Sequence, residues 1–159
     1  MTDEMTISHA SDVDAPEILA LTRRAFAAAA ELYDDPDLPP LVETLDEHRA
    51  RYGTFVVLKA TDADGVIAGS VQGRLADDGS CYVARLAVDP GRQGSGIGRA
   101  LTLALEAEFP TARRFELFTG HLNTASLGLY ASLGYAETRR EPVDDRLTLV
   151  WLEKTLPGA

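Results

Sequence analysis

Residues 88–101 of this 159-residue chain, VDPGRQGSGIGRAL, decide its fold. The apolar run at 82–88 predicts a strand, which must end before Pro90 because proline has no N–H to donate to a sheet. Gly94, Gly96 and Gly98 follow at every second position, and apolar residues then recur at helical spacing. A strand, glycine loop and helix in this order direct free backbone amides and the positive end of a helix dipole at one point. Such a point binds an anion, usually a phosphate.

Three interpretations compete for the glycine loop. A dinucleotide-binding fold requires Gly-x-Gly-x-x-Gly after its first strand, and a P-loop requires Gly-Lys-Ser/Thr. Here the spacing is Gly-x-Gly-x-Gly, no Gly-Lys-Ser/Thr occurs at this loop, and the preceding strand is about the fourth of the chain. A flexible loop without a ligand is the third interpretation, and glycines alone do not exclude it.

The string at 85–90 followed by 93–98 resembles the acyl-CoA-binding signature of the GNAT superfamily of N-acetyltransferases, Gln/Arg-x-x-Gly-x-Gly/Ala. Gln93, Gly96 and Gly98 stand at the signature positions. The resemblance implies acetyl-CoA as cofactor. The residues it places at the cofactor are Leu86, Ala87, Val88, Arg92, Gln93, Gly94, Ser95, Gly96, Ile97, Gly98, Arg99, Asn123, Ser126 and Tyr130.

Composition limits the classes of partner. Apolar residues make up 45% of the chain, which suffices for one domain with a core, and we expect a single domain over 1–159. The formal charge of -10 repels nucleic acid and anionic membranes, so neither is expected as a partner. Cys81 is the single cysteine, so no disulfide forms within the chain. The first five residues do not resemble a signal peptide, and we expect a cytoplasmic protein without a metal site.

The remaining elements are predicted from periodicity and turn residues. Four helices are expected. The first begins after an N-cap at Asp14 and ends near Tyr33, and the next two cover 41–51 and 96–109. The fourth covers 125–133, with Asn123 or Thr124 as its N-cap and Gly134 closing it. Strands are expected at 5–8, 54–61, 66–75, 81–88, 113–119, 135–140 and 146–154.

This order predicts a mixed α+β fold. We expect a central, mostly antiparallel, twisted sheet of about seven strands flanked by about four helices. A helix connects the fourth and fifth strands, so those two can lie parallel. The GNAT superfamily has the same element order, and the resemblance therefore covers nearly the whole chain and implies that this parallel pair is splayed.

A second motif lies at Asn123–Tyr135, with Tyr130 seven residues after Asn123 and Gly134-Tyr135 behind it. It resembles the C-terminal GNAT motif, in which the tyrosine lies beside the CoA sulfur and the asparagine helps to hold the cofactor. A tyrosine pKa of about 10 and a thiol pKa of about 8.5 allow Tyr130 to protonate a leaving thiolate. Without that spacing, Tyr130 would be interpreted as an ordinary core aromatic.

Three sources compete for the base that takes the proton of the attacking amine. Some GNAT proteins carry a glutamate on the fifth strand, where this chain has Phe118. Glu116 lies two residues earlier and on the same side of the strand, and His121 lies in the following loop. A solvated glutamate and a loop histidine are the plainer interpretations of these two residues, and deprotonation through water remains open. The resemblance also implies that a backbone N–H of Leu86, Ala87 or Val88, splayed by a bulge, stabilises the oxyanion.

Other polar residues allow two interpretations each. Arg92 and Arg99 are either surface charges or contacts to CoA phosphates. Arg85 either binds a substrate carboxylate or pairs with an acid on a neighbouring strand. Tyr33 and His48 belong to the helices that shape the acceptor pocket in this superfamily, although packing at a helix end or face is the favoured interpretation of both.

We therefore expect an N-acetyltransferase that transfers an acetyl group from acetyl-CoA directly to a primary amine of a small molecule or peptide, with Tyr130 as general acid. Cys81 lacks a paired histidine, so no covalent intermediate is expected. Alternatives are a non-catalytic acyl-CoA-binding or sensor domain and a nucleotide-binding α/β protein. A homodimer through the C-terminal strands is a further expectation from the resemblance.

Overall fold

The computed structural model describes residues 4–156, so Met1 to Asp3 of the stretch tested for a signal peptide lie outside the described residues. The strands are β1 (Thr6–His9), β2 (Val56–Thr61), β3 (Ile67–Leu75), β4 (Cys81–Val88), β5 (Arg114–Gly120), β6 (Ala136–Pro142) and β7 (Thr148–Thr155). The helices are α1 (Ala15–Leu32), α2 (Pro39–Val42), α3 (Leu45–Arg51), α4 (Ile97–Ala107) and α5 (Thr124–Ser132), with 3-10 turns at Asp12–Asp14 and Pro90–Arg92.

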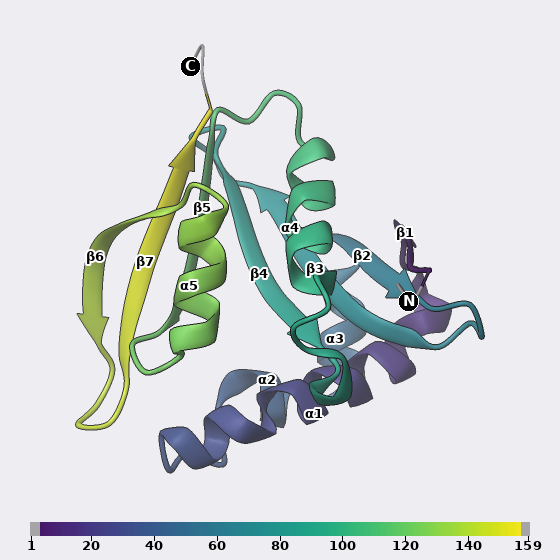
Figure 1. The fold of residues 1–159 in the computed structure, drawn as a ribbon, viewed down its shortest axis with the longest axis horizontal. Coiled ribbons are helices and arrows are strands. Elements are labelled where there is room, and N and C mark those ends of the chain that lie inside the picture. Colours follow the sequence, from purple (N-terminus) through teal and green to yellow (C-terminus); the bar gives the residue numbers. More distant parts are fainter. Residues whose placement is uncertain (1–3, 157–159) are drawn as a thin grey trace.

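The strands form one seven-stranded sheet in the order β1-β2-β3-β4-β5-β7-β6 (Figure 1). Every neighbouring pair is antiparallel except β4 and β5, which are parallel. The predicted mixed sheet with one parallel pair is therefore confirmed. The β4–β5 pairing covers only Cys81 with Phe115 and Tyr82 with Glu116, and the two strands separate beyond Tyr82.

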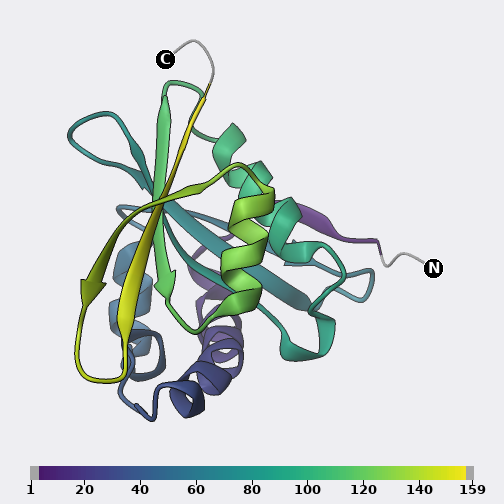
Figure 2. The ribbon, with the colours of Figure 1, turned by 60° about the vertical axis from the view of Figure 1, so that its left-hand side comes forward.

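Helices cover both faces of the sheet (Figures 1 and 2). Helices α4 and α5 pack on one face in a core cluster that includes Leu101, Leu105, Phe115 and Tyr130. Helix α1 covers the other face through Ile18 and Leu21, which pack against β2, β3 and β4. Burying one large apolar side chain contributes about 1.5–3 kcal/mol, so these two layers supply most of the free energy that favours folding.

Two glycines of β3 bring α4 close to the sheet. A Cβ at Gly69 would lie 2.8 Å from side-chain atoms of Ile97 and Leu101, and one at Gly73 would lie 2.9 Å from Leu105. Because neither glycine has a Cβ, the first turn of α4 lies directly over β3. This close packing fixes the height of the α4 N-terminus above the sheet.

The single helix predicted over 41–51 is wrong. The structure has α2 and α3 instead, with Glu43 between them in an extended conformation at ψ 130°. The Thr44 hydroxyl accepts the N–H of Glu47 at 3.1 Å, and the Glu47 carboxylate accepts the N–H of Thr44 at 2.9 Å. This capping box starts a new helix at Leu45 and turns the Glu43 side chain inward.

Two residues predicted as N-caps occupy the N-cap position, but their side chains do not cap the helix. Asp14 and Asn123 immediately precede α1 and α5, but neither side chain bonds an amide of its helix. The Asp14 carboxylate accepts the N–H of Ser11 at 3.0 Å and pairs with Lys59 at 2.9 Å. Longer-range partners therefore compete successfully for these side chains.

Residues 4–156 contain neither a membrane-spanning helix nor a cluster of metal-ligating side chains. None of the helices there has the length and apolar character needed to cross a membrane. No group of three or more His, Cys, Asp or Glu side chains in that range is placed to hold a metal ion.

Candidate active site

The separation of β4 from β5 begins next to a bulge. Ser70 pairs with Ala87 and Gln72 with Ala84, so Arg85 and Leu86 together face a single β3 residue. Arg85 adopts a left-handed conformation at φ +55°, which non-glycine residues rarely take. Such a bulge bends its strand and changes the direction of its side chains and amides. The bulge implied by the resemblance is therefore present in β4.

One cavity of about 750 Å³ lies at the N-terminus of α4, between the glycine loop, α1 and α5; we call it the glycine-loop cavity. Gly94 and Gly96 have φ angles of +82° and +89°, which favour glycine. The first hydrogen bond inside α4 runs from the Ala100 N–H to the Gly96 carbonyl at 3.0 Å. The amides before Ala100 are therefore left without helical partners and form an anion-binding helix end.

Most residues predicted at the cofactor line this cavity: Leu86, Val88, Arg92, Gln93, Gly94, Gly96, Ile97, Gly98, Arg99, Asn123 and Ser126. Ala87 and Ser95 do not line it. The Ala87 side chain is buried in the core beneath α1, and the Ser95 hydroxyl donates to the Arg92 carbonyl at 2.5 Å. The Arg92 guanidinium pairs with Asp62 at 2.7 Å.

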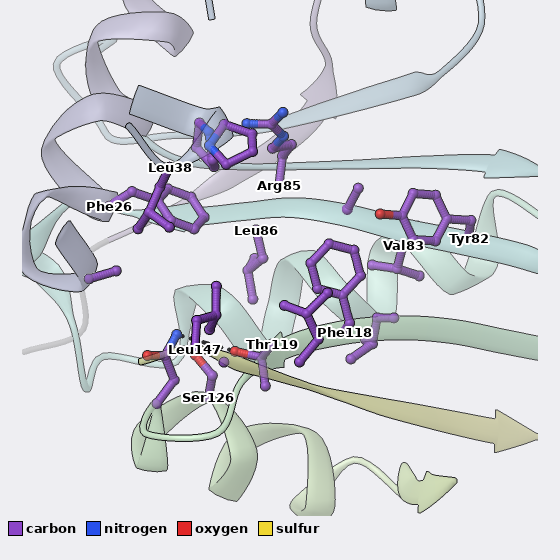
Figure 3. A pocket seen from close by; sticks show the side chains of 18 of the residues that line it. Phe26, Leu38, Tyr82, Val83, Arg85, Leu86, Phe118, Thr119, Ser126 and Leu147 are labelled. Atoms are coloured by element: carbon purple, nitrogen blue, oxygen red, sulfur yellow. Dashed lines mark hydrogen bonds between the residues drawn. The ribbon is translucent and has the colours of Figure 1, made fainter. Parts of the chain in front are cut away.

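A second cavity of about 590 Å³ lies where β4 and β5 diverge; we call it the inter-strand cavity (Figure 3). Leu86 of β4 extends into the gap toward Phe118 and Thr119 of β5, while Arg85 points to the opposite side of β4. Phe26, Ala29, Leu86, Asn123 and Ser126 line both cavities. The two cavities therefore adjoin at these residues.

Tyr130 lies on α5 and lines the inter-strand cavity, with 7% of its surface exposed. Its ring meets that of Tyr135 edge-on at 5.7 Å between centroids. Burial raises the pKa of Tyr130 above its ordinary value, so the hydroxyl keeps its proton at neutral pH. The hydroxyl therefore carries a proton at the cavity wall, which is the protonation state of a general acid, while the raised pKa makes it a weaker acid than free tyrosine.

Neither predicted base lines either cavity. Glu116 sits where β5 pairs with both neighbours, opposite Tyr82 and Glu153. The Nδ1 atom of His121 accepts the N–H of Thr148 at 3.0 Å, and its ring packs at 5.8 Å from that of Tyr33. Neither side chain therefore reaches the lining, and the inter-strand cavity is lined by no aspartate, glutamate or histidine among the described residues.

Tyr33 joins the end of α1 to the start of α5. Its hydroxyl donates to Asn123 Oδ1 at 2.9 Å and accepts the N–H of Leu122 at 2.9 Å. The Asn123 amide in turn donates to Thr119 Oγ1 at 3.2 Å. A Cβ at Gly120 would lie 2.0 Å from the Tyr33 hydroxyl, so only glycine leaves room for this contact.

Arg85 has an acidic partner, but not on a neighbouring strand. Its Nη2 lies 3.3 Å from Glu43 Oε2, and the same carboxylate lies 3.1 Å from His48 Nδ1 and 3.7 Å from Arg51. The Nε2 atom of His48 meets the Tyr52 hydroxyl at 3.0 Å. Burial lowers the pKa of His48, while the adjacent Glu43 opposes that effect. His48 is therefore buried without lining the inter-strand cavity, whereas Tyr33 and Arg85 line it.

Cys81 is fully buried in the core cluster beneath α4 and α5. Burial raises its pKa to about 12, so the reactive thiolate is scarce at neutral pH.

Residues 16–135 match the family described as Acetyltransferase (GNAT) family. The chain belongs to the GNAT acetyltransferase family. Its GNAT fold is shared at a TM-score of 0.80 with the ribosomal-protein-S18-alanine N-acetyltransferase from Escherichia coli, at 22% identity, covering 98% of this chain and 96% of that one. The yncA protein from Salmonella typhimurium, solved with its cofactor acetyl-CoA, has a TM-score of 0.76 at 24% identity, covering 98% and 96%.

A curated GNAT relative is longer than this chain. Mycothiol acetyltransferase from Beutenbergia cavernae is 33% identical over 125 residues, which is 74% of this chain and 39% of the relative. The chain therefore spans well under half the length of that relative.

The sequence analysis missed part of both cavities. In the glycine-loop cavity it missed the contribution of α1, namely Ala25, Phe26, Ala28, Ala29 and Leu32. In the inter-strand cavity it missed the polar and aromatic residues Arg51, Phe55, Arg74 and Tyr82. These residues come from α3, the segment before β2, β3 and β4, and no short motif links them.

Proposed function

We propose that residues 1–159 form a single GNAT domain that transfers the acetyl group of acetyl-CoA to a primary amine. The observation that carries this proposal is the junction of the two cavities at Leu86, Asn123 and Ser126. The glycine-loop cavity offers helix-end amides that suit a pyrophosphate, with Arg99 at its wall. The inter-strand cavity offers an adjoining, mostly apolar space for the amine.

Each chemical task has a residue of this chain. Bound acetyl-CoA supplies a thioester whose acetyl group passes to the amine nitrogen as the C–S bond breaks. Tyr130 donates its proton to the departing sulfur, a role supported by its place at the cavity wall. The β4 amides of Leu86, Ala87 or Val88 serve the oxyanion, because β4 has no ladder with β5 beyond Tyr82.

Water takes the proton of the attacking amine in this proposal. Neither Glu116 nor His121 lines the inter-strand cavity. A chain of waters from the cavity mouth can carry the proton to solvent, while the protein supplies orientation. The dependence of rate on pH should then follow the amine itself rather than a side chain.

Isothermal titration with acetyl-CoA, CoA, ATP and NAD tests the cofactor first. We expect acetyl-CoA and CoA to bind with micromolar affinity and ATP and NAD to bind far more weakly. A thiol-release assay over a panel of primary amines then tests transfer. Failure to bind acetyl-CoA, or preferential binding of NAD or ATP, would overturn the proposed cofactor.

A non-catalytic acyl-CoA sensor is the second candidate. The absence of a carboxylate or imidazole from the described lining of the inter-strand cavity favours it. The position of Tyr130 favours the enzyme. Acetyl-CoA binding without acetylation of any amine on a panel that spans charged, aromatic and peptide amines would favour the sensor.

A homodimer through the C-terminal strands is a separate proposal. Strand β6 is the outermost strand next to β7, and all seven of its residues are exposed. An exposed edge strand is a ready surface for pairing with another chain. Sedimentation analysis of the purified protein tests this point.

A further inference from the structure

Three arginines converge on one end of the inter-strand cavity. Arg51 of α3, Arg74 of β3 and Arg85 of β4 all line it. The guanidinium carbons of Arg51 and Arg74 lie 4.4 Å and 5.6 Å from the centre of the Phe55 ring. Burial raises the pKa of Tyr82 in the same wall, the three arginines oppose that effect together, and Glu116 adds to it more weakly than any of them. Their positive potential therefore overlaps at one place.

The acidic groups nearby do not cancel this charge. Glu43 pairs with both Arg51 and Arg85, so one carboxylate faces two guanidinium groups. His48 is kept neutral by burial. Arg74 meets the rings of Phe55 and Tyr82 rather than a carboxylate in the described structure. A cationic cavity end inside a chain of formal charge -10 is unexpected from composition.

One donor at this end lacks an acceptor. The Nη1 atom of Arg85 is buried and has no hydrogen-bond partner among the described residues, although Nη2 of the same group meets Glu43. Leaving a buried charged donor unpaired is costly. The other walls of the cavity are apolar and aromatic, with Phe26, Leu38 and Phe118 among them (Figure 3).

We infer that the acceptor is an amine that also carries a carboxylate and an apolar side chain, as a free aromatic or aliphatic amino acid does. The carboxylate binds at Arg51, Arg74 and Arg85, and the apolar group lies against the aromatic walls. Carboxylate recognition by several guanidinium groups is strong because the hydrogen bonds are charge-assisted. The inference rests on the proposed function, since it names the substrate class of the same site.

The test uses two acetylated products that differ only in the carboxylate, N-acetylphenylalanine and N-acetyl-2-phenylethylamine. Neither has a titratable amine, so binding reports the carboxylate alone. Trp151, the single tryptophan, packs 4.9 Å from the Phe118 ring and provides a fluorescence signal for titration of the CoA complex. We expect N-acetylphenylalanine to bind roughly 10- to 100-fold more tightly.

Arg74→Gln is the variant of choice, because Arg74 is exposed and its loss should leave the fold intact. It should reduce that preference about tenfold without weakening the neutral product. Arg49→Gln is the matched control: Arg49 is exposed on α3, lies outside both cavities and pairs with Asp12. It should leave the preference unchanged.

The outcomes separate the two proposals. Equal affinity for the two products, or binding of neither, in a protein that binds acetyl-CoA and acetylates an amine overturns the carboxylate inference and leaves the proposed function standing. An unchanged preference in Arg74→Gln overturns the role of this arginine end. Failure to bind acetyl-CoA overturns the proposed function itself.

Discussion

The two cavities are built in different ways. The glycine-loop cavity takes its free backbone amides from one short stretch, 92–99, at the N-terminus of α4, while side chains of α1 and α5 complete its lining. The inter-strand cavity takes its lining mostly from side chains of α1, α2, α3, α5, β3, β4, β5 and β7. Backbone amides are present whatever the side chains are, so the first cavity suits a constant ligand. The second changes with every substitution, so it suits a ligand that varies between relatives.

The largest expected effect separates chemistry from cofactor binding. Tyr130→Phe removes the proposed acid and should lower kcat by about two to four orders of magnitude. Affinity for acetyl-CoA, measured by calorimetry, should stay close to that of the parent protein. Tyr135→Phe is the control on the neighbouring ring, since its hydroxyl bonds Glu106 at 2.9 Å and should affect stability rather than kcat. An unchanged kcat in Tyr130→Phe would remove this residue from the mechanism.

A charge introduced at the glycine loop should affect ligand binding in the glycine-loop cavity alone. Gly96→Glu introduces a carboxylate at the α4 N-terminus, where φ is +89°. We expect acetyl-CoA affinity to fall by about two orders of magnitude, close to 3 kcal/mol. Gly65→Glu has the same charge at φ +83° in an open turn, so it matches the strain without touching the site. Equal losses in both variants would mean that strain, not anion repulsion, explains the result.

A third change tests the contact through which Tyr33 joins the end of α1 to the start of α5. Gly120→Ala would place a Cβ 2.0 Å from the Tyr33 hydroxyl and displace this buried ring from Asn123. Overpacking and the lost hydrogen bonds should destabilise the fold by about 2–4 kcal/mol in urea unfolding. Gly128→Ala on α5 meets nothing within 4 Å and should instead stabilise by about 0.5–1 kcal/mol. Unchanged stability in Gly120→Ala would show that Tyr33 can move freely.

The smallest effect concerns the network behind the arginines. Burial lowers the pKa of His48 below the ordinary 6.5, so the unfolded chain binds a proton that the folded protein rejects. Stability should therefore fall as pH drops below 6.5, by at most about 1.4 kcal/mol per pH unit, and level off below the folded pKa.

Urea unfolding at pH 6.5 and at about pH 5 measures this slope. Since other groups also titrate in that range, the relevant quantity is the difference between the parent protein and His48→Gln. Parallel slopes in the two proteins would contradict a depressed pKa at His48.

Sequence reasoning succeeded where structure is local. The proline stop, the glycine spacing and the turn residues predicted the strand–loop–helix unit, and most residues predicted at the cofactor line the glycine-loop cavity. It failed where a long-range partner decided the outcome. The break between α2 and α3 at Glu43 depends on a capping box and on guanidinium groups from β4 and α3 that pair with Glu43. The Asn123 side chain accepts a hydrogen bond from Tyr33, 90 residues earlier, instead of bonding an amide of α5. Of the three arginines at the end of the inter-strand cavity, only Arg85 was predicted as a substrate contact, because the three side chains come together only after folding.

Position 85 has a consequence for protein engineering. The left-handed backbone there costs a side chain about 1–2 kcal/mol, which glycine would not incur. A screen for thermal stability would therefore tend to replace Arg85 with glycine or asparagine, and so remove one of the cations at the cavity end. Selection for activity and selection for robustness act against each other at this residue, and libraries made for either purpose should hold it fixed.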